Sequence, residues 1–213
     1  MREQSAAVGC PRTMLVRAKD QIRSDRKGAG ANGAGQTEPG WICLDTFAPG
    51  WRYGRTREPL VLVDAPAHEL VHARQAELGC LRDGKDQRWR WLFEGMAVDL
   101  SWRALVQEGE AREADAVASI RRFGAFSPRI GPLVRYEQGN GGDAEYARWH
   151  LAVRDLLRRT HSSPADEMRF CRRAGRGSAW HAAFRQTFGI DVESYYAAFA
   201  RALPGYAARE RRL

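Results

Sequence analysis

Residues 64–79 have the sequence DAPAHELVHARQAELG, and this stretch decides how the rest of the chain is interpreted. Asp64 followed by Pro66 is typical of a helix start, because an acid caps the free N–H groups and the first turn tolerates proline. On a helix, residues four apart share a face, so His68 and His72 direct their imidazoles to the same side. The stretch therefore predicts a helix that presents two histidines as a pair of ligands.

Glu69 is the third functional position of this helix, turned by about 100° from His68. The pattern H-E-x-x-H thus places two metal ligands beside an acid that is left to carry a proton, as zinc-dependent hydrolysis requires. In a chain with five histidines, an accidental match has a chance of about one in a hundred. Two ordinary histidines on a helix are the alternative interpretation.

Residues 91–97, with the sequence WLFEGMA, supply a candidate for a third ligand. A catalytic zinc takes three protein ligands and keeps a fourth position for water, so two histidines are an incomplete site. Glu94 lies 22 residues (94 − 72) after His72, beyond a polar turn at 82–86 and near the start of a helical pattern at 87–108. A reversal of this length lets the second helix pack across the first.

The apolar residues around Glu94 are an unusual setting for a carboxylate. Acids are rarely buried unless they are paired or bound to a metal. An exposed glutamate at a helix start, stabilised by the helix dipole, is the alternative. Joined to the upstream pair, the block predicts His68, His72 and Glu94 as ligands of Zn²⁺.

Together, the two blocks resemble the gluzincin metallopeptidases, in which a glutamate on the next helix is the third zinc ligand. The second block is similar to the WLNEG pattern of the large aminopeptidases, with Phe93 in place of the asparagine. In length the chain is closer to the compact peptidase MA-like domains. It also resembles them at Tyr146-Ala147 and at residues 182–190 (AAFRQTFGI), so the resemblance covers about residues 41–203.

The resemblance implies a hydrolase, a zinc-dependent peptidase with His68, His72 and Glu94 as ligands and Glu69 as general base. Zinc lowers the pKa of its bound water to about 7, and Glu69 takes the proton as the water attacks a peptide carbonyl. The same acid then protonates the leaving amine. Endopeptidase action is mildly preferred, because no motif before His68 would anchor the free amine of a substrate.

Members of the family also place a tyrosine or histidine over the developing oxyanion, where a donor contributes about 3 kcal/mol. Tyr146 matches the tyrosine of the related domains, and His150 lies one helical turn later on the same face. We favour Tyr146 as the catalytic donor. Asp99, five residues after Glu94, is interpreted as a solvated acid on a helix face rather than the partner of a ligand histidine.

The resemblance also implies an α+β, zincin-like fold, with a small twisted β-sheet over the active-site helix and a mostly helical C-terminal lobe. We divide the chain into a basic, glycine-rich and partly flexible segment (1–40), a zincin-like metallopeptidase domain (41–205) and a basic tail (206–213). Strands are expected at 14–16, 41–47 and 60–63, and further helices at 110–123, 146–160 and 192–203.

The formal net charge of +8 raises two alternatives to a simple peptidase. The basic residues are mostly arginines and are scattered, so nucleic-acid binding, as in a protease recruited to DNA, is a minor alternative. A zincin-like domain that has lost catalysis and serves as a binding or regulatory module is the other. The expected partner is a peptide or protein substrate, and the oligomeric state is not predicted.

Two features of the sequence, its apolar runs and its cysteines, indicate in which cellular compartment the protein is expected. No run of about 18 apolar residues exists, so no membrane span is expected. The N-terminus lacks an apolar signal core, which predicts a cytoplasmic protein, or an exported one if the true start lies upstream. In a reducing compartment the cysteines are free thiols, whereas export would allow one or two disulfides that the sequence cannot pair. The four cysteines are Cys10, Cys43, Cys80 and Cys171.

Overall fold

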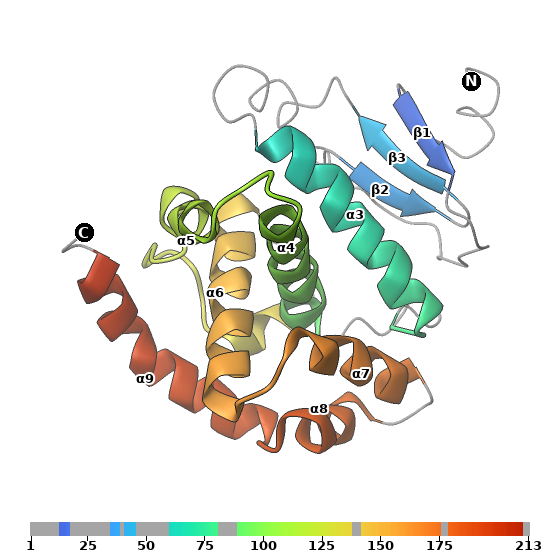
Figure 1. Ribbon diagram of the computed structural model, residues 1–213. Coiled ribbons are helices and arrows are strands. Elements are labelled where there is room, and N and C mark those ends of the chain that lie inside the picture. Colours follow the sequence, from blue (N-terminus) through green and yellow to red (C-terminus); the bar gives the residue numbers. More distant parts are fainter. Residues whose placement is uncertain are drawn as a thin grey trace.

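Figure 1 shows a computed structural model, which describes residues 13–17, 35–38, 41–45, 60–80, 89–137, 142–175 and 179–210. Most of the described chain is helical. The strands are β1 (Thr13–Arg17), β2 (Gly35–Glu38) and β3 (Trp41–Asp45). The helices are α3 (Val61–Glu77), α4 (Arg90–Gln107), α5 (Glu113–Arg122), the short 3-10 helix η1 (Leu133–Tyr136), α6 (Asp143–Thr160), α7 (Pro164–Gly175), α8 (Trp180–Phe188) and α9 (Val192–Glu210).

The predicted α+β class, with a small twisted sheet over the active-site helix, is wrong, because the described chain is mostly helical. The strands have only 5, 4 and 5 residues and pair antiparallel in the order β1-β3-β2 beside α3 (Figure 1). The buried core of the described residues lies among the helices instead. Residues 60–63, expected as a strand, form the N-cap and the first three residues of α3, because a short apolar run suits either element.

Helix α3 therefore begins earlier than the capping pattern predicts. Pro66 is its sixth residue rather than part of its first turn, so one backbone hydrogen bond of the helix is missing there. The helix ends just before Gly79, which takes a left-handed φ of 87° directly after the last turn. A Cβ on Gly79 would also come within 2.9 Å of the Cα of Gly175, so the ends of α3 and α7 meet backbone to backbone.

Close packing of α4 against α6 sets the centre of the molecule (Figure 1). A Cβ on Gly95 would lie 2.8 Å from the backbone oxygen of Trp149, so only glycine lets the two helices approach this far. Trp91, Leu92 and Trp149 are fully buried around this contact. Burying each such side chain stabilises the fold by roughly 1.5–3 kcal/mol.

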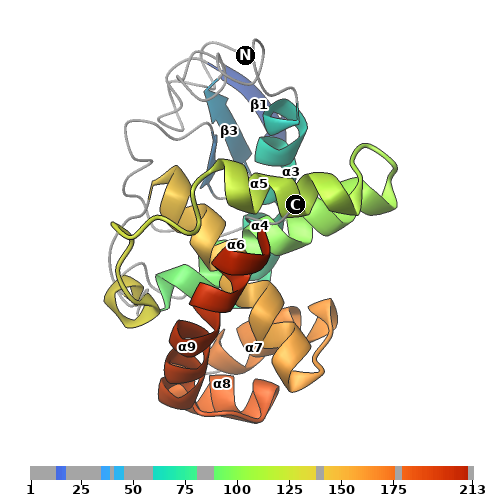
Figure 2. The same cartoon turned by 90° about the vertical axis from the view of Figure 1, so that its left-hand side faces the viewer.

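Helix α9 is held against this pair by two tyrosines. The Tyr195 hydroxyl donates to the backbone oxygen of Ala152, at 2.5 Å, and the indole N–H of Trp91 donates to the Tyr196 hydroxyl, at 2.9 Å. Figure 2 shows α7 and α8 below the α4–α6 pair and the first turns of α3 above it. The middle of α3 lies beside the first turns of α4 and α6, where His68 is close to Glu94 and Tyr146.

Cys80, just after α3, forms a disulfide with Cys171 of α7, and both are buried. The structure thus gives a pairing of two cysteines that the sequence alone left open. Cys10 and the side chain of Cys43 lie outside the described residues. The bond closes a separation of 91 residues beside the Gly79–Gly175 contact.

The helices expected at 87–108, 110–123, 146–160 and 192–203 are confirmed by α4, α5, α6 and α9, with ends that move by a few residues. α9 continues to Glu210 and so enters the segment expected as a tail. The expected flexible part of segment 1–40 falls outside the described residues. Within the described chain, no helix has the length and apolar character needed to cross a bilayer.

Candidate metal centre

Three predicted ligands meet where the middle of α3 crosses the first turns of α4. The Nε2 atom of His68 lies 3.2 Å from Oε2 of Glu94, and the Nε2 atom of His72 lies 3.0 Å from the same oxygen. In the described part of the chain, these residues form the one group of three or more His, Cys, Asp or Glu whose ligand atoms all lie within 4.8 Å.

The chemistry of these atoms, and two of the three distances among them, are compatible with a small divalent cation. Bonds of about 2.0–2.1 Å in a tetrahedral arrangement place ligand atoms about 3.3 Å apart, close to the two distances observed. Imidazole nitrogen and carboxylate oxygen are a donor set that suits zinc. The side chains of His68, His72 and Glu94 are only 14%, 10% and 4% exposed, so bulk water hardly competes for them.

Gln75 fixes the ring of His72 and was missed by the sequence reasoning. Its Oε1 lies 2.7 Å from Nδ1 of His72, while its Nε2 donates to the backbone oxygen of Phe93 at 2.9 Å. Because an amide oxygen only accepts, Nδ1 carries the proton and Nε2 is the nitrogen left for a cation. Phe93 also stacks on the imidazole, with ring centroids 4.5 Å apart. The three-residue spacing from His72 was the signal that could have found Gln75.

Glu94 and His72 each shift the pKa of the other. Burial alone would raise the pKa of the Glu94 carboxyl, but the charge of His72, hydrogen bonds from both histidines and the charge of Arg90 hold it well below its ordinary value. Burial alone would lower the pKa of His72, but the charge and hydrogen bond of Glu94 raise it. The site is therefore built around an ionised carboxylate that favours positive charge.

Tyr146, in the first turn of α6, stands at the edge of this group. Its ring centroid lies 6.1 Å from that of His68, and its hydroxyl interacts with Arg90 and Glu94. Burial and the charge of Glu94 raise the pKa of the hydroxyl above its ordinary value. Tyr146 is therefore a neutral hydrogen-bond donor beside the ligands.

In comparisons with protein-family models, curated proteins and solved structures, nothing matches this chain. Its interpretation rests on the geometry of its own residues.

Glu69 lies at the same centre, as the helical spacing predicts. It is buried, and its charge acts on both His72 and Arg90. Its carboxylate is therefore within electrostatic reach of His72 but outside the group of candidate ligand atoms.

The alternative oxyanion donor, His150, does not join the group. It is 1% exposed, and its Nε2 lies 3.5 Å from Oδ1 of Asp99 inside the helical core. Asp99, interpreted from the sequence as a solvated acid, is in fact fully buried and pairs with Arg103 at 2.5 Å. The interpretation was wrong because burial of this face of α4 depends on α6 and α7, which its own sequence does not reveal.

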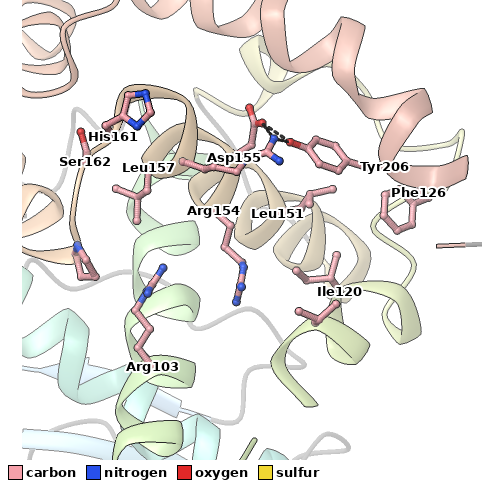
Figure 3. A pocket seen from close by; sticks show the side chains of 13 residues that line it. Arg103, Ile120, Phe126, Leu151, Arg154, Asp155, Leu157, His161, Ser162 and Tyr206 are labelled. Atoms are coloured by element: carbon pink, nitrogen blue, oxygen red, sulfur yellow. Dashed lines mark hydrogen bonds and ion pairs between the residues drawn. The ribbon is translucent and has the colours of Figure 1, made fainter. Parts of the chain in front are cut away.

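A separate hollow of about 680 Å³ lies farther along α4 and α6 (Figure 3). Arg103 and Arg154 point into it, and Tyr206 of α9 bonds to Asp155 at its edge. Neither it nor a second hollow around Leu100 is lined by the three ligands. The three candidate ligands therefore lie outside both hollows.

Proposed function

We propose that this protein is a zinc-dependent peptidase with His68, His72 and Glu94 as metal ligands. One observation carries the proposal: two imidazole nitrogens of α3 come close to one carboxylate oxygen of α4, although the residues are 26 and 22 positions apart in the sequence. Two exposed or unrelated histidines would not share one oxygen of a buried glutamate. The Glu69 carboxylate on the same helix supports a hydrolytic centre rather than a purely structural one.

Zinc bound by this group would polarise a water molecule and lower its pKa to about 7. The chain's own residues would handle the protons and the charge that follow. Glu69 accepts the proton of the water and returns it to the leaving amine. The neutral hydroxyl of Tyr146 donates a hydrogen bond to the oxygen of the attacked carbonyl, where such a donor contributes about 3 kcal/mol.

Metal analysis of the purified protein tests the first half of the proposal. We expect about one zinc per chain in the wild type and a loss of zinc in His68→Ala, because two remaining ligands hold the ion poorly. His181→Ala is the matched control: His181 is exposed on α8, near Glu193, and its removal should leave the zinc content unchanged. Wild-type protein that binds no zinc would refute the proposal.

Glu69→Gln tests the second half, because it removes the proton acceptor and leaves the three ligands in place. We expect this variant to keep its zinc and to lose hydrolysis of a denatured protein substrate or a peptide library. A variant with normal hydrolysis contradicts the role of Glu69. Zinc-loaded wild type that cleaves neither substrate favours the binding or regulatory module instead.

The Cys80–Cys171 disulfide supports a further part of the proposal, an oxidising compartment. Such bonds persist in secreted and periplasmic proteins and are rare where thioredoxin and glutathione keep thiols reduced. We therefore propose that the peptidase works outside the reducing cytoplasm. Mass spectrometry of protein from native cells, alkylated before and after reduction, checks this: alkylation of Cys80 before reduction contradicts it.

A further inference from the structure

We propose that Arg90 is a positioning residue of the metal centre, holding one oxygen of Glu94 so that only the other oxygen faces the ion. The inference rests on the proposed zinc site. It concerns how many ligand atoms the carboxylate supplies, a property that H-E-x-x-H and the downstream glutamate leave open.

Arg90 and Glu94 form an ion pair across one turn of α4. NH2 of Arg90 lies 2.8 Å from Oε1 of Glu94, and the two side chains are 22% and 4% exposed. An ion pair so shielded is screened less by salt than a surface pair, and a carboxylate at this depth needs a partner. Arg90 supplies it at the first residue of the helix.

The two oxygens of Glu94 therefore have different neighbours. Oε2 faces both histidines, at 3.0 and 3.2 Å, whereas Oε1 faces the guanidinium. A free carboxylate can give a metal one oxygen or two. With Oε1 engaged by Arg90, Glu94 gives one, so the protein supplies three ligand atoms and a fourth position remains for water.

The same guanidinium also interacts with the Tyr146 hydroxyl. One side chain thus ties a ligand on α4 to the candidate oxyanion donor on α6. Arginine suits this task better than lysine, because its planar group offers five N–H donors in fixed directions. We expect its removal to disturb both the coordination of the ion and the placement of Tyr146.

Zinc titration against a competing chelator tests the proposal with Arg90→Met and Arg90→Lys. Partners that orient a metal ligand typically contribute 10–100-fold to metal affinity, so we expect a loss of about that size in Arg90→Met. Arg90→Lys should recover part of it. Arg74→Met is the matched control, since Arg74 pairs with Glu77 three residues later on α3 but is largely exposed; its zinc affinity should be unchanged.

The visible absorption spectrum of bound cobalt reports the number of ligand atoms, which would not change if Arg90 only stabilised the fold. If Arg90 limits Glu94 to one oxygen, cobalt-loaded Arg90→Met gains a fifth ligand atom. Its visible absorption bands then weaken relative to those of the wild type. Circular dichroism of each variant shows whether it is folded, and if Arg90→Met is not, Arg90→Gln takes its place.

The outcomes separate this proposal from the proposed function. If the wild-type protein binds no zinc, both the proposed peptidase function and the proposed role of Arg90 are refuted. Wild-type protein that binds zinc, beside a folded Arg90→Met or Arg90→Gln with the same affinity and the same cobalt spectrum, overturns the role of Arg90 alone. A weaker affinity together with an altered spectrum supports it.

Discussion

At the scale of single residues, the orientation of His72 depends on Gln75. We expect Gln75→Leu to lower zinc affinity by about 10–100-fold, because Nδ1 loses its acceptor and the ring no longer has a fixed tautomer. Chelator competition measures the affinity, and nitrogen NMR of the histidine rings reports the tautomer. Gln186→Leu, at an exposed position of α8, is the control. Unchanged affinity in Gln75→Leu would show that Phe93 stacking alone holds the ring.

Tyr146 and His150 were both candidates for the oxyanion donor, and the structure favours the first. Tyr146→Phe should keep its zinc and lose about 100-fold in kcat, the value of one well-placed donor. His150→Asn should keep kcat and lose stability, because His150 lies in the core beside Asp99. Steady-state kinetics together with thermal unfolding of both variants distinguishes them. The reverse pattern would transfer the role to His150.

Much of the candidate site could be predicted from sequence because its parts are local. The spacing of His68 and His72 fixes their common face, and the apolar setting of Glu94 indicates its burial. Gln75 was missed because its only signal in the sequence is the three-residue spacing from His72, which is not part of the H-E-x-x-H motif. The burial of Asp99 was not predicted, because it depends on helices that are distant in the sequence.

At the scale of elements, the glycine after Glu94 sets the distance between α4 and α6. Gly95→Ala should lower the free energy of unfolding by about 1–3 kcal/mol, because its Cβ would meet the backbone of Trp149 and Val153 Cγ2 at 2.8 Å. Gly205→Ala in α9 meets nothing within 4 Å, so it should instead stabilise the protein by up to about 1 kcal/mol. Urea unfolding measures both, and equal effects would contradict the close approach.

Element types were predictable where a helix is long, and fold class was not. α4 and α6 carry apolar residues over 18 positions each, long enough for the helical period to show. The four apolar residues at 60–63 are too few to distinguish a strand from a helix start. The extent of the helical core depends on contacts among α4, α6 and α9, which no single segment encodes.

At the scale of the whole molecule, the disulfide links α3 to the C-terminal helices. Cys80→Ser with Cys171→Ser should cost about 2–5 kcal/mol, since the bond limits the unfolded chain across a separation of 91 residues. Urea unfolding with and without reductant measures it: the wild type should lose more stability on reduction than the double variant does. A wild type of unchanged stability after complete reduction would contradict this.

The buried acid of α7 makes the stability of the whole fold depend on pH. Glu167 is 0% exposed, and its two carboxyl oxygens make no hydrogen bond of good geometry within the described residues. Burial, and then the charge of Asp99, raises the pKa of Glu167 well above 4.5. The folded protein therefore binds a proton at pH values where the unfolded chain has released it.

The ordinary pKa of this carboxyl is 4.5. Below about that pH, the protonated Glu167 contributes fully to the free energy of unfolding. This contribution is lost as the pH rises through the pKa that Glu167 has in the folded protein. Over that window the loss from this one group approaches 1.4 kcal/mol per pH unit. Glu167→Gln, which stays neutral, should remove this part of the slope and stabilise the protein at neutral pH. Urea unfolding from pH 4.5 to 8 measures it, with Glu110→Gln, at an exposed position, as the control. If Glu167→Gln keeps the wild-type slope, Glu167 is ionised in the folded state and Arg103 balances its charge.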